Sequence, residues 1–198
     1  MSAILSDALA AGVTVIFSAG NGHRAFPACH PDVIAVGGTT VDSNGALKAS
    51  SYASSFASNL FPGRRVPDFC GVVGESGNPP LPGHILLPVP VGSKRDGDNL
   101  PQGARGRGWG IFSGTSASAP QVAGIAARML SVNPSLSPAG IRAILAATAR
   151  DVENGSSAHG EEAGPGMDLA TGAGFVDAFA ACQRVRQSSA EPQSASRS

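Results

Sequence analysis

The chain is organised around the sequence GTSASAPQVAGIAARML, which occupies residues 114–130. Its larger apolar residues recur at the three- and four-residue spacing of one helix face, at Val122, Ile125, Ala126, Met129 and Leu130. Small residues fill much of the remaining helix surface, namely Ala123, Gly124 and Ala127. The pattern therefore predicts a helix that is buried on most of its sides.

Ser116 lies at or near the start of this predicted helix, and two roles compete for it. Gly114 allows a tight turn just before it. The unpaired N–H groups and the dipole at a helix start favour negative charge there. A serine in this place is most often an N-cap, whose hydroxyl accepts a hydrogen bond from the backbone. The alternative is a nucleophile whose own N–H stabilises an oxyanion.

The first third of the chain predicts alternating helices and strands. Residues 4–9 form a short amphipathic pattern, and the apolar, β-branched segment 13–17 predicts a strand buried on both faces. A second strand is predicted at residues 33–36, ending in two glycines. This order favours a parallel α/β sheet, in which ligands bind beyond the carboxyl ends of strands. Asn21 lies at such an end, although an asparagine between glycines is more often a turn residue.

Two segments resemble those of one protein family. The sequence GTSASAPQVAG at residues 114–124 resembles the nucleophile segment of the subtilisin-like serine proteases (subtilases), with Ser116 as the nucleophile. Ser118 stands where many members have alanine, and the related sedolisins often carry serine there. The sequence GVTVIFSAGN at residues 12–21 resembles the subtilase strand that delivers the asparagine of the oxyanion hole, where sedolisins use aspartate. Together the motifs extend the resemblance over roughly residues 3–186.

The resemblance implies a fold and a set of site residues. The fold is α/β, with three layers and a mostly parallel sheet flanked by helices, incomplete at its N-terminus. The Asn21 side chain and the Ser116 N–H would donate to the oxyanion. Residues Ser18, Ala19 and Gly20 would line the primary specificity pocket, where small side chains leave room for a large apolar substrate residue.

The chain length predicts one domain, comprising residues 1–186 and a disordered, polar tail at 187–198. A Pro/Gly-rich loop occupies residues 74–108, and only residues 84–89 within it have the pattern of a strand. Near the C-terminus, the sequence GAG at 172–174 resembles the family's closing turn into a last helix.

Composition argues against several classes of function. Lysine and arginine (14) balance aspartate and glutamate (14), so nothing indicates a nucleic-acid partner or an anionic membrane. The chain has no run apolar enough to span a bilayer and no recognisable signal peptide, and only the resemblance implies an extracellular location. The residues Cys29, Cys70 and Cys182 form no metal motif, and they leave open one disulfide with a free thiol or three thiols. No metal site is predicted, and calcium is implied only by the resemblance.

A serine nucleophile needs a histidine base and an orienting carboxylate, which in subtilases precede the asparagine segment. No histidine of this chain lies in a matching motif, and His159 follows Ser116 in the wrong order. We therefore expect part of a serine endopeptidase that hydrolyses peptides or proteins through an acyl-enzyme. A missing N-terminal segment of the same domain would supply the base. The alternative is a truncated or degenerate, non-catalytic module that binds peptides or a partner.

Overall fold

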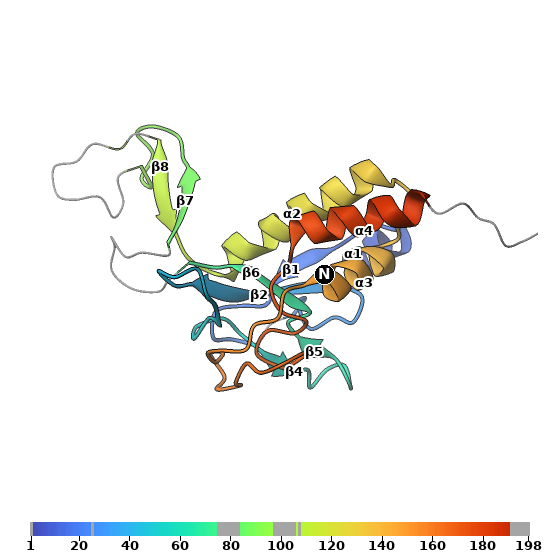
Figure 1. The fold of residues 1–198 in the computed structure, drawn as a ribbon, viewed down its shortest axis with the longest axis horizontal. Coiled ribbons are helices and arrows are strands. Elements are labelled where there is room, and N and C mark those ends of the chain that lie inside the picture. The colour runs from blue at the N-terminus through green and yellow to red at the C-terminus, as the bar shows by residue number, and fades with distance from the viewer. Residues whose placement is uncertain (1, 25, 75–83, 97–105, 107, 191–198) are drawn as a thin grey trace, which may run out of the picture.

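The computed structural model describes residues 2–24, 26–74, 84–96, 106 and 108–190, and these form an α/β fold (Figure 1). Its helices are α1 (Ser2–Ala10), α2 (Thr115–Val132), α3 (Pro138–Thr148) and α4 (Ala178–Ala190). Its strands are β1 (Ile16–Ser18), β2 (Ile34–Val41), β3 (Leu47–Ala49), β4 (Phe56–Ala57), β5 (Arg65–Val66), β6 (Phe69–Val72), β7 (Ile85–Pro88) and β8 (Trp109–Phe112). The helix predicted at the start of the chain and the last helix are confirmed as α1 and α4.

The central sheet is built around β2. Strands β1 and β6 pair with it in parallel, and β3 pairs with its end in the antiparallel sense. In the register, Ile16 lies opposite Ile34, and Val36 lies opposite Phe69. The expectation of a mostly parallel sheet is therefore confirmed. Two separate antiparallel pairs, β4–β5 and β7–β8, complete the strands.

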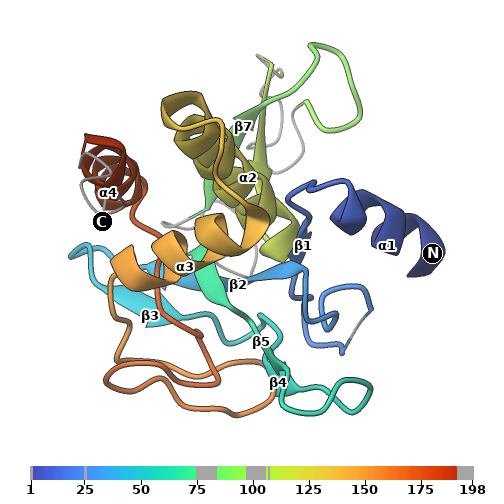
Figure 2. The same ribbon diagram turned by 90° about the vertical axis from the view of Figure 1, so that its right-hand side faces the viewer.

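Helices cover one face of this sheet, as Figure 2 shows from the side of α3. Because side chains alternate between the faces of a strand, Ile34 and Val36 point to the same side. There they join a core of α2, α3 and α4 residues that includes Val122, Ala126, Met129, Ile141, Leu145, Ala181 and Val185. The apolar stripe predicted for α2 is the one that packs on the sheet.

The opposite face carries a second, smaller core. Ala35 lies between Ile34 and Val36 in β2, so it points to this side, where it packs with Ala19, Phe56 and Val66. In the described part of the chain this face is covered by β4, β5 and irregular segments, below the sheet in Figure 1. The helical layer is therefore on one side only among these residues.

The two predicted strands differ from the observed ones in length. Strand β1 begins at Ile16 and is half-buried, and Val13 is half-exposed. The prediction of a strand buried on both faces is wrong here, because all three residues of β1 are only half-buried among the described residues. Strand β2 instead continues through Gly37, where a Cβ atom would lie 2.7 Å from the Pro67 ring. The glycines permit this close packing rather than ending the strand.

Helix α2 is less buried than its sequence predicts. Its buried residues lie along one side, at Thr115, Ser118, Val122, Ala126 and Met129. On the other side Ala123, Gly124 and Ala127 are exposed, and a Cβ atom at Gly124 would meet no heavy atom within 4 Å. The prediction of burial on most sides is therefore wrong for the described residues, which cover the helix from one side.

The long loop and the tail are only partly described. The strand predicted at residues 84–89 is confirmed as β7, and it pairs with β8, which the sequence analysis did not predict. This hairpin stands away from the rest of the molecule beyond the start of α2 (Figure 1). Residues 75–83, 97–105 and 107 of the loop lie outside the described residues. Helix α4 continues to Ala190, so residues 187–190 are helical rather than part of a tail, and residues 191–198 are not described.

Candidate active site

The end of β1 and the start of α2 meet although more than 90 residues separate them in sequence. The Thr115 N–H donates to Asn21 Oδ1 over 3.0 Å, and the Thr115 hydroxyl donates to the same oxygen over 2.9 Å. In return, Gly20 N–H donates to Thr115 Oγ1 over 3.3 Å. These bonds place Asn21 beside the first turn of α2, which carries Ser116.

The hydrogen bonds also decide how the Asn21 amide is oriented. Thr115 N–H can only donate, so the atom of Asn21 that faces it must be the carbonyl oxygen Oδ1. The amide nitrogen Nδ2 is then the end that faces away from this bond. Asn21 is therefore held as a hydrogen-bond donor, which is the polarity that an oxyanion requires.

Ser116 is the second residue of α2, and its side chain is exposed. The N-cap position belongs to Gly114, which has no side chain to form a cap hydrogen bond. The N-cap interpretation of Ser116 is therefore wrong. As a first-turn residue, Ser116 has a backbone N–H without a partner inside the helix, and it lies at the positive end of the helix dipole.

Gly114 leaves open the space between the two candidate donors. Its φ is 125°, in the region that favours glycine. A Cβ atom at this position would lie 3.2 Å from Asn21 Nδ2 and 3.8 Å from Ser116 N. Both donors thus border one small space that any larger residue would fill. This arrangement suits a single oxygen atom with developing negative charge.

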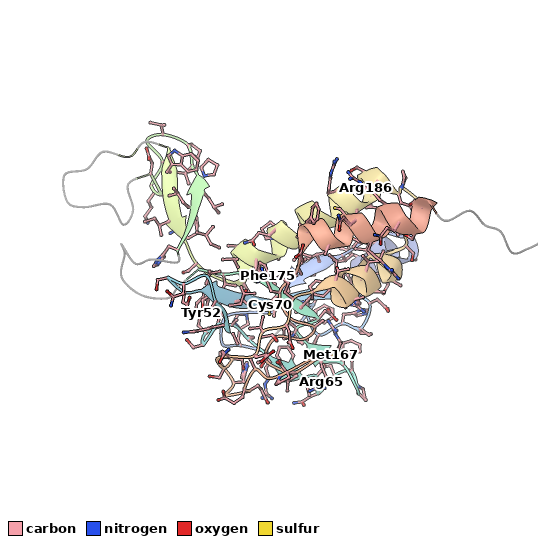
Figure 3. All side chains as sticks on the ribbon, in the orientation of Figure 1. Tyr52, Arg65, Cys70, Met167, Phe175 and Arg186 are labelled. Atoms are coloured by element: carbon pink, nitrogen blue, oxygen red, sulfur yellow. The ribbon has the colours of Figure 1, made fainter. Side chains whose placement is uncertain are left out.

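Tyr52 supports Gly114 and was not singled out by the sequence analysis. Its hydroxyl oxygen accepts a 2.9 Å hydrogen bond from Gly114 N–H, which also donates to Val73 O over 2.8 Å. The same hydroxyl lies 2.7 Å from Val73 O and 2.9 Å from Gly74 O (Figure 3 labels Tyr52). A single tyrosine in a serine-rich stretch carries no periodic signal that could have revealed this contact.

The three residues predicted to line a specificity pocket lie directly before Asn21. Ala19 is fully buried, and its side chain belongs to the second core. The space beside Gly20 is occupied, because a Cβ atom there would lie 2.9 Å from His23 O and 3.0 Å from Ser54 Oγ. Ser18 is half-buried at the end of β1. The side chain of Ala19 therefore has a packing role, and the proposed contact of Ser18, Ala19 and Gly20 with substrate stays a prediction.

No hydrogen bond joins the Ser116 hydroxyl to a histidine within the described residues. His159 Nδ1 accepts a hydrogen bond from Ser55 N–H over 3.3 Å. His30 packs edge-on against an aromatic ring, with 5.2 Å between its centroid and that of Phe61. Both rings are thus engaged in other contacts. The described residues present a candidate nucleophile and oxyanion donors without a candidate base in place.

Side chains that commonly bind metal ions do not cluster within the described residues. They include no group of three or more histidine, cysteine or acidic side chains arranged to hold one. The three cysteines are free thiols, and burial raises the pKa of Cys70 well above its ordinary value. The calcium implied by the family resemblance remains a prediction. None of the described helices is both long and apolar enough to cross a membrane.

This fold and site define a subtilisin-like α/β domain, and comparisons with known proteins agree. Residues 1–174 match the model of the subtilase family, peptidase S8, and the chain belongs to this family. A subtilisin-like protease of Arabidopsis thaliana, SBT1.4, is 48% identical over 62 residues, which are 31% of this chain and 7% of that protein.

Solved structures extend the likeness to the whole fold. Fervidolysin from Fervidobacterium pennivorans, described as a keratinolytic enzyme related to subtilisin, is 28% identical with a TM-score of 0.66. The match covers 90% of this chain and 24% of fervidolysin. A lanthipeptide protease, at 24% identity and a TM-score of 0.63, shows the same fold over 90% of this chain and 53% of its own. The chain thus spans between a quarter and about half of these two relatives.

Proposed function

We propose that this chain is part of the catalytic domain of a serine endopeptidase, in which Ser116 is the nucleophile. The observation that carries the proposal is the space at Gly114, which the Asn21 amide and the Ser116 N–H both border. Family membership supports the same reaction class. The substrate is a peptide or protein.

The chemistry follows from the positions of these groups. Ser116 Oγ attacks the carbonyl carbon of the scissile peptide bond, and the carbonyl oxygen becomes an oxyanion between the two donors. The C–N bond then breaks, the amine leaves with a proton, and water hydrolyses the acyl-enzyme. Thr115 contributes by holding Asn21 Oδ1, so that the amide hydrogen atoms stay directed toward the oxyanion.

The base that removes the Ser116 proton comes from outside the described residues in this proposal. Two features support a further segment of the same domain as its source. One side of α2 exposes Ala123, Gly124 and Ala127, and β1 pairs along one edge only among the described residues. A segment that packed along β1 would reach the end of this strand, where Asn21 contacts the start of α2.

A non-catalytic module that binds peptides is the second candidate. The observation in its favour is that the Ser116 hydroxyl has no histidine partner among the described residues. A fluorophosphonate probe separates the two, because it labels only an activated serine. We expect no labelling of the chain alone, and labelling of Ser116 when the remaining domain is supplied, fused or in trans. Absence of labelling in the assembled domain would favour the binding module.

Site variants in the assembled domain test the assigned roles. Ser116→Ala should abolish acyl-enzyme formation. Asn21→Ala should lower kcat and kcat/KM together by about 10²–10³-fold, the size measured for one such donor in a related enzyme, and leave KM nearly unchanged. Ser131→Ala, an exposed serine at the other end of α2, is the matched control and should leave both constants unchanged. An effect of Asn21→Ala on KM alone would show that Asn21 binds the ground state or merely shapes the turn.

A further inference from the structure

A pocket of about 680 Å³ lies away from the candidate active site, and the proposed reaction does not use it. Its lining comes from the segment around β5, from α3 and from the turn before α4, and includes Phe61, Arg64, Arg65, Asp68, Arg142 and Met167. Figure 3 shows Arg65 and Met167 near each other, below α3 in this view. Neither Asn21 nor Ser116 is part of this lining.

Arginine and aspartate side chains both line the pocket. Arg64 forms a two-pronged ion pair with Asp68, with N–O distances of 2.5 and 2.8 Å. Arg142 approaches the same carboxylate, with its Nη2 atom 3.7 Å from Asp68 Oδ2. Two guanidinium groups thus share one carboxylate. With Arg65 and Asp168 also present, the lining holds three arginines and two carboxylates, and Asp32, outside the lining, also acts on Arg142.

Several contacts hold the side chains of Arg64 and Arg142 in place. Arg142 donates to Pro31 O over 2.7 Å and also to Val33 O, and the Arg64 side chain is only 9% exposed. The Nε atoms of both arginines are buried and have no hydrogen-bond partner within the described residues. Burial lowers the pKa of Arg142, and the charge of Arg64 lowers it further, while Asp68 and Asp32 oppose both effects. A negative charge entering the pocket would stabilise this group of cations.

Arg65 supplies a guanidinium group that a ligand can reach. Its side chain is exposed and lines the pocket, and it takes part in no ion pair among the described residues. The apolar walls are formed by side chains such as Phe61, Pro67 and Met167. The pocket volume lies within the range of small-molecule sites.

We infer that this pocket binds a small organic acid that presents one carboxylate on an apolar body. The exposed Arg65 guanidinium, which has no ion-pair partner among the described residues, matches one carboxylate. Asp68 and Asp168 both line the pocket, and their repulsion would be stronger for a doubly charged group such as a phosphate than for one carboxylate. Arg65 and Arg142 face the carboxylate, and the ring of Phe61 packs against the apolar body.

Calorimetric titration of the full chain with hippurate tests this inference. Hippurate joins a carboxylate to an aromatic amide, and hippuramide is its neutral counterpart of the same shape. We expect saturable binding of one hippurate per chain, with hippuramide at least about tenfold weaker because it lacks the charge. Absence of hippurate binding, or equal binding of the two compounds, would overturn the inference.

Substitutions inside and outside the pocket test where hippurate binds. Met167→Glu adds a negative charge in the lining, and Phe179→Glu adds one on α4, at positions that are 71% and 72% exposed. We expect Met167→Glu to weaken hippurate binding by about tenfold and Phe179→Glu to leave it unchanged, although the net charge is the same. Arg65→Gln should weaken it by about fivefold. Equal effects of the two glutamate variants would show non-specific electrostatic attraction and contradict a site in this pocket.

Discussion

The two sides of α2 have opposite surroundings. One side buries Val122 and Met129 completely against the sheet. The other exposes Ala123, Gly124 and Ala127. Small residues thus share the exposed side with polar ones such as Gln121 and Arg128. This exposed side is the surface on which we propose that a further segment of the domain packs.

The buried side also anchors the candidate site. Ser118 is fully buried, and its hydroxyl lies 2.8 Å from Gly37 O in β2 and 2.9 Å from Thr115 O. Its hydroxyl therefore links the first turn of α2 to the central strand β2 by hydrogen bonds. Ser116 lies two residues earlier in the same turn and faces solvent. The two serines have different environments because residues two positions apart on a helix point about 200° apart.

The largest difference between the two sides should appear on truncation of Met129. Met129→Ala removes a fully buried side chain from the main core, so we expect the free energy of unfolding to fall by about 3 kcal/mol. Arg128→Ala, next to it on the exposed side, should change stability by less than about 0.5 kcal/mol. Chemical denaturation measures both values. Equal losses of stability in the two variants would show that α2 does not pack through one side alone.

Ser118→Ala should have an intermediate effect. It removes a buried hydroxyl and leaves Gly37 O without one of its donors, so we expect a loss of about 1–2 kcal/mol. Ser131→Ala on the exposed end of the same helix is the control and should be nearly neutral. Thermal unfolding of the two variants would check the difference. A neutral Ser118→Ala would contradict the anchoring role of this serine.

The smallest predicted effect is a gain in stability rather than a loss. Gly124→Ala places a methyl group in open space on the exposed side of α2 and improves helix propensity, so stability should rise by about 0.5–1 kcal/mol. The measurement is the denaturation midpoint of the chain alone. A decrease would mean that another segment already packs closely against Gly124 in solution.

Local sequence patterns were sufficient to predict several features of this protein. The spacing of Val122, Ala126 and Met129 predicts both the helix and its sheet-facing side. Ser137 followed by Pro138 predicts the start of α3, where Ser137 Oγ accepts from Gly140 N–H over 3.1 Å. The motif around Ser116 indicates the family, and the family model confirms it. These signals are local because helix periodicity and caps depend on residues within a few positions of each other.

The tertiary structure decided the features that depend on distant residues. The sequence does not show that Thr115 holds Asn21 Oδ1, or that Tyr52 supports Gly114. It also does not show that Arg64 and Arg142, from separate elements, share the carboxylate of Asp68. The burial of α2 was overestimated because residue type determines only the tendency to be buried. What covers a surface depends on which segments pack against it, and only the three-dimensional arrangement determines that.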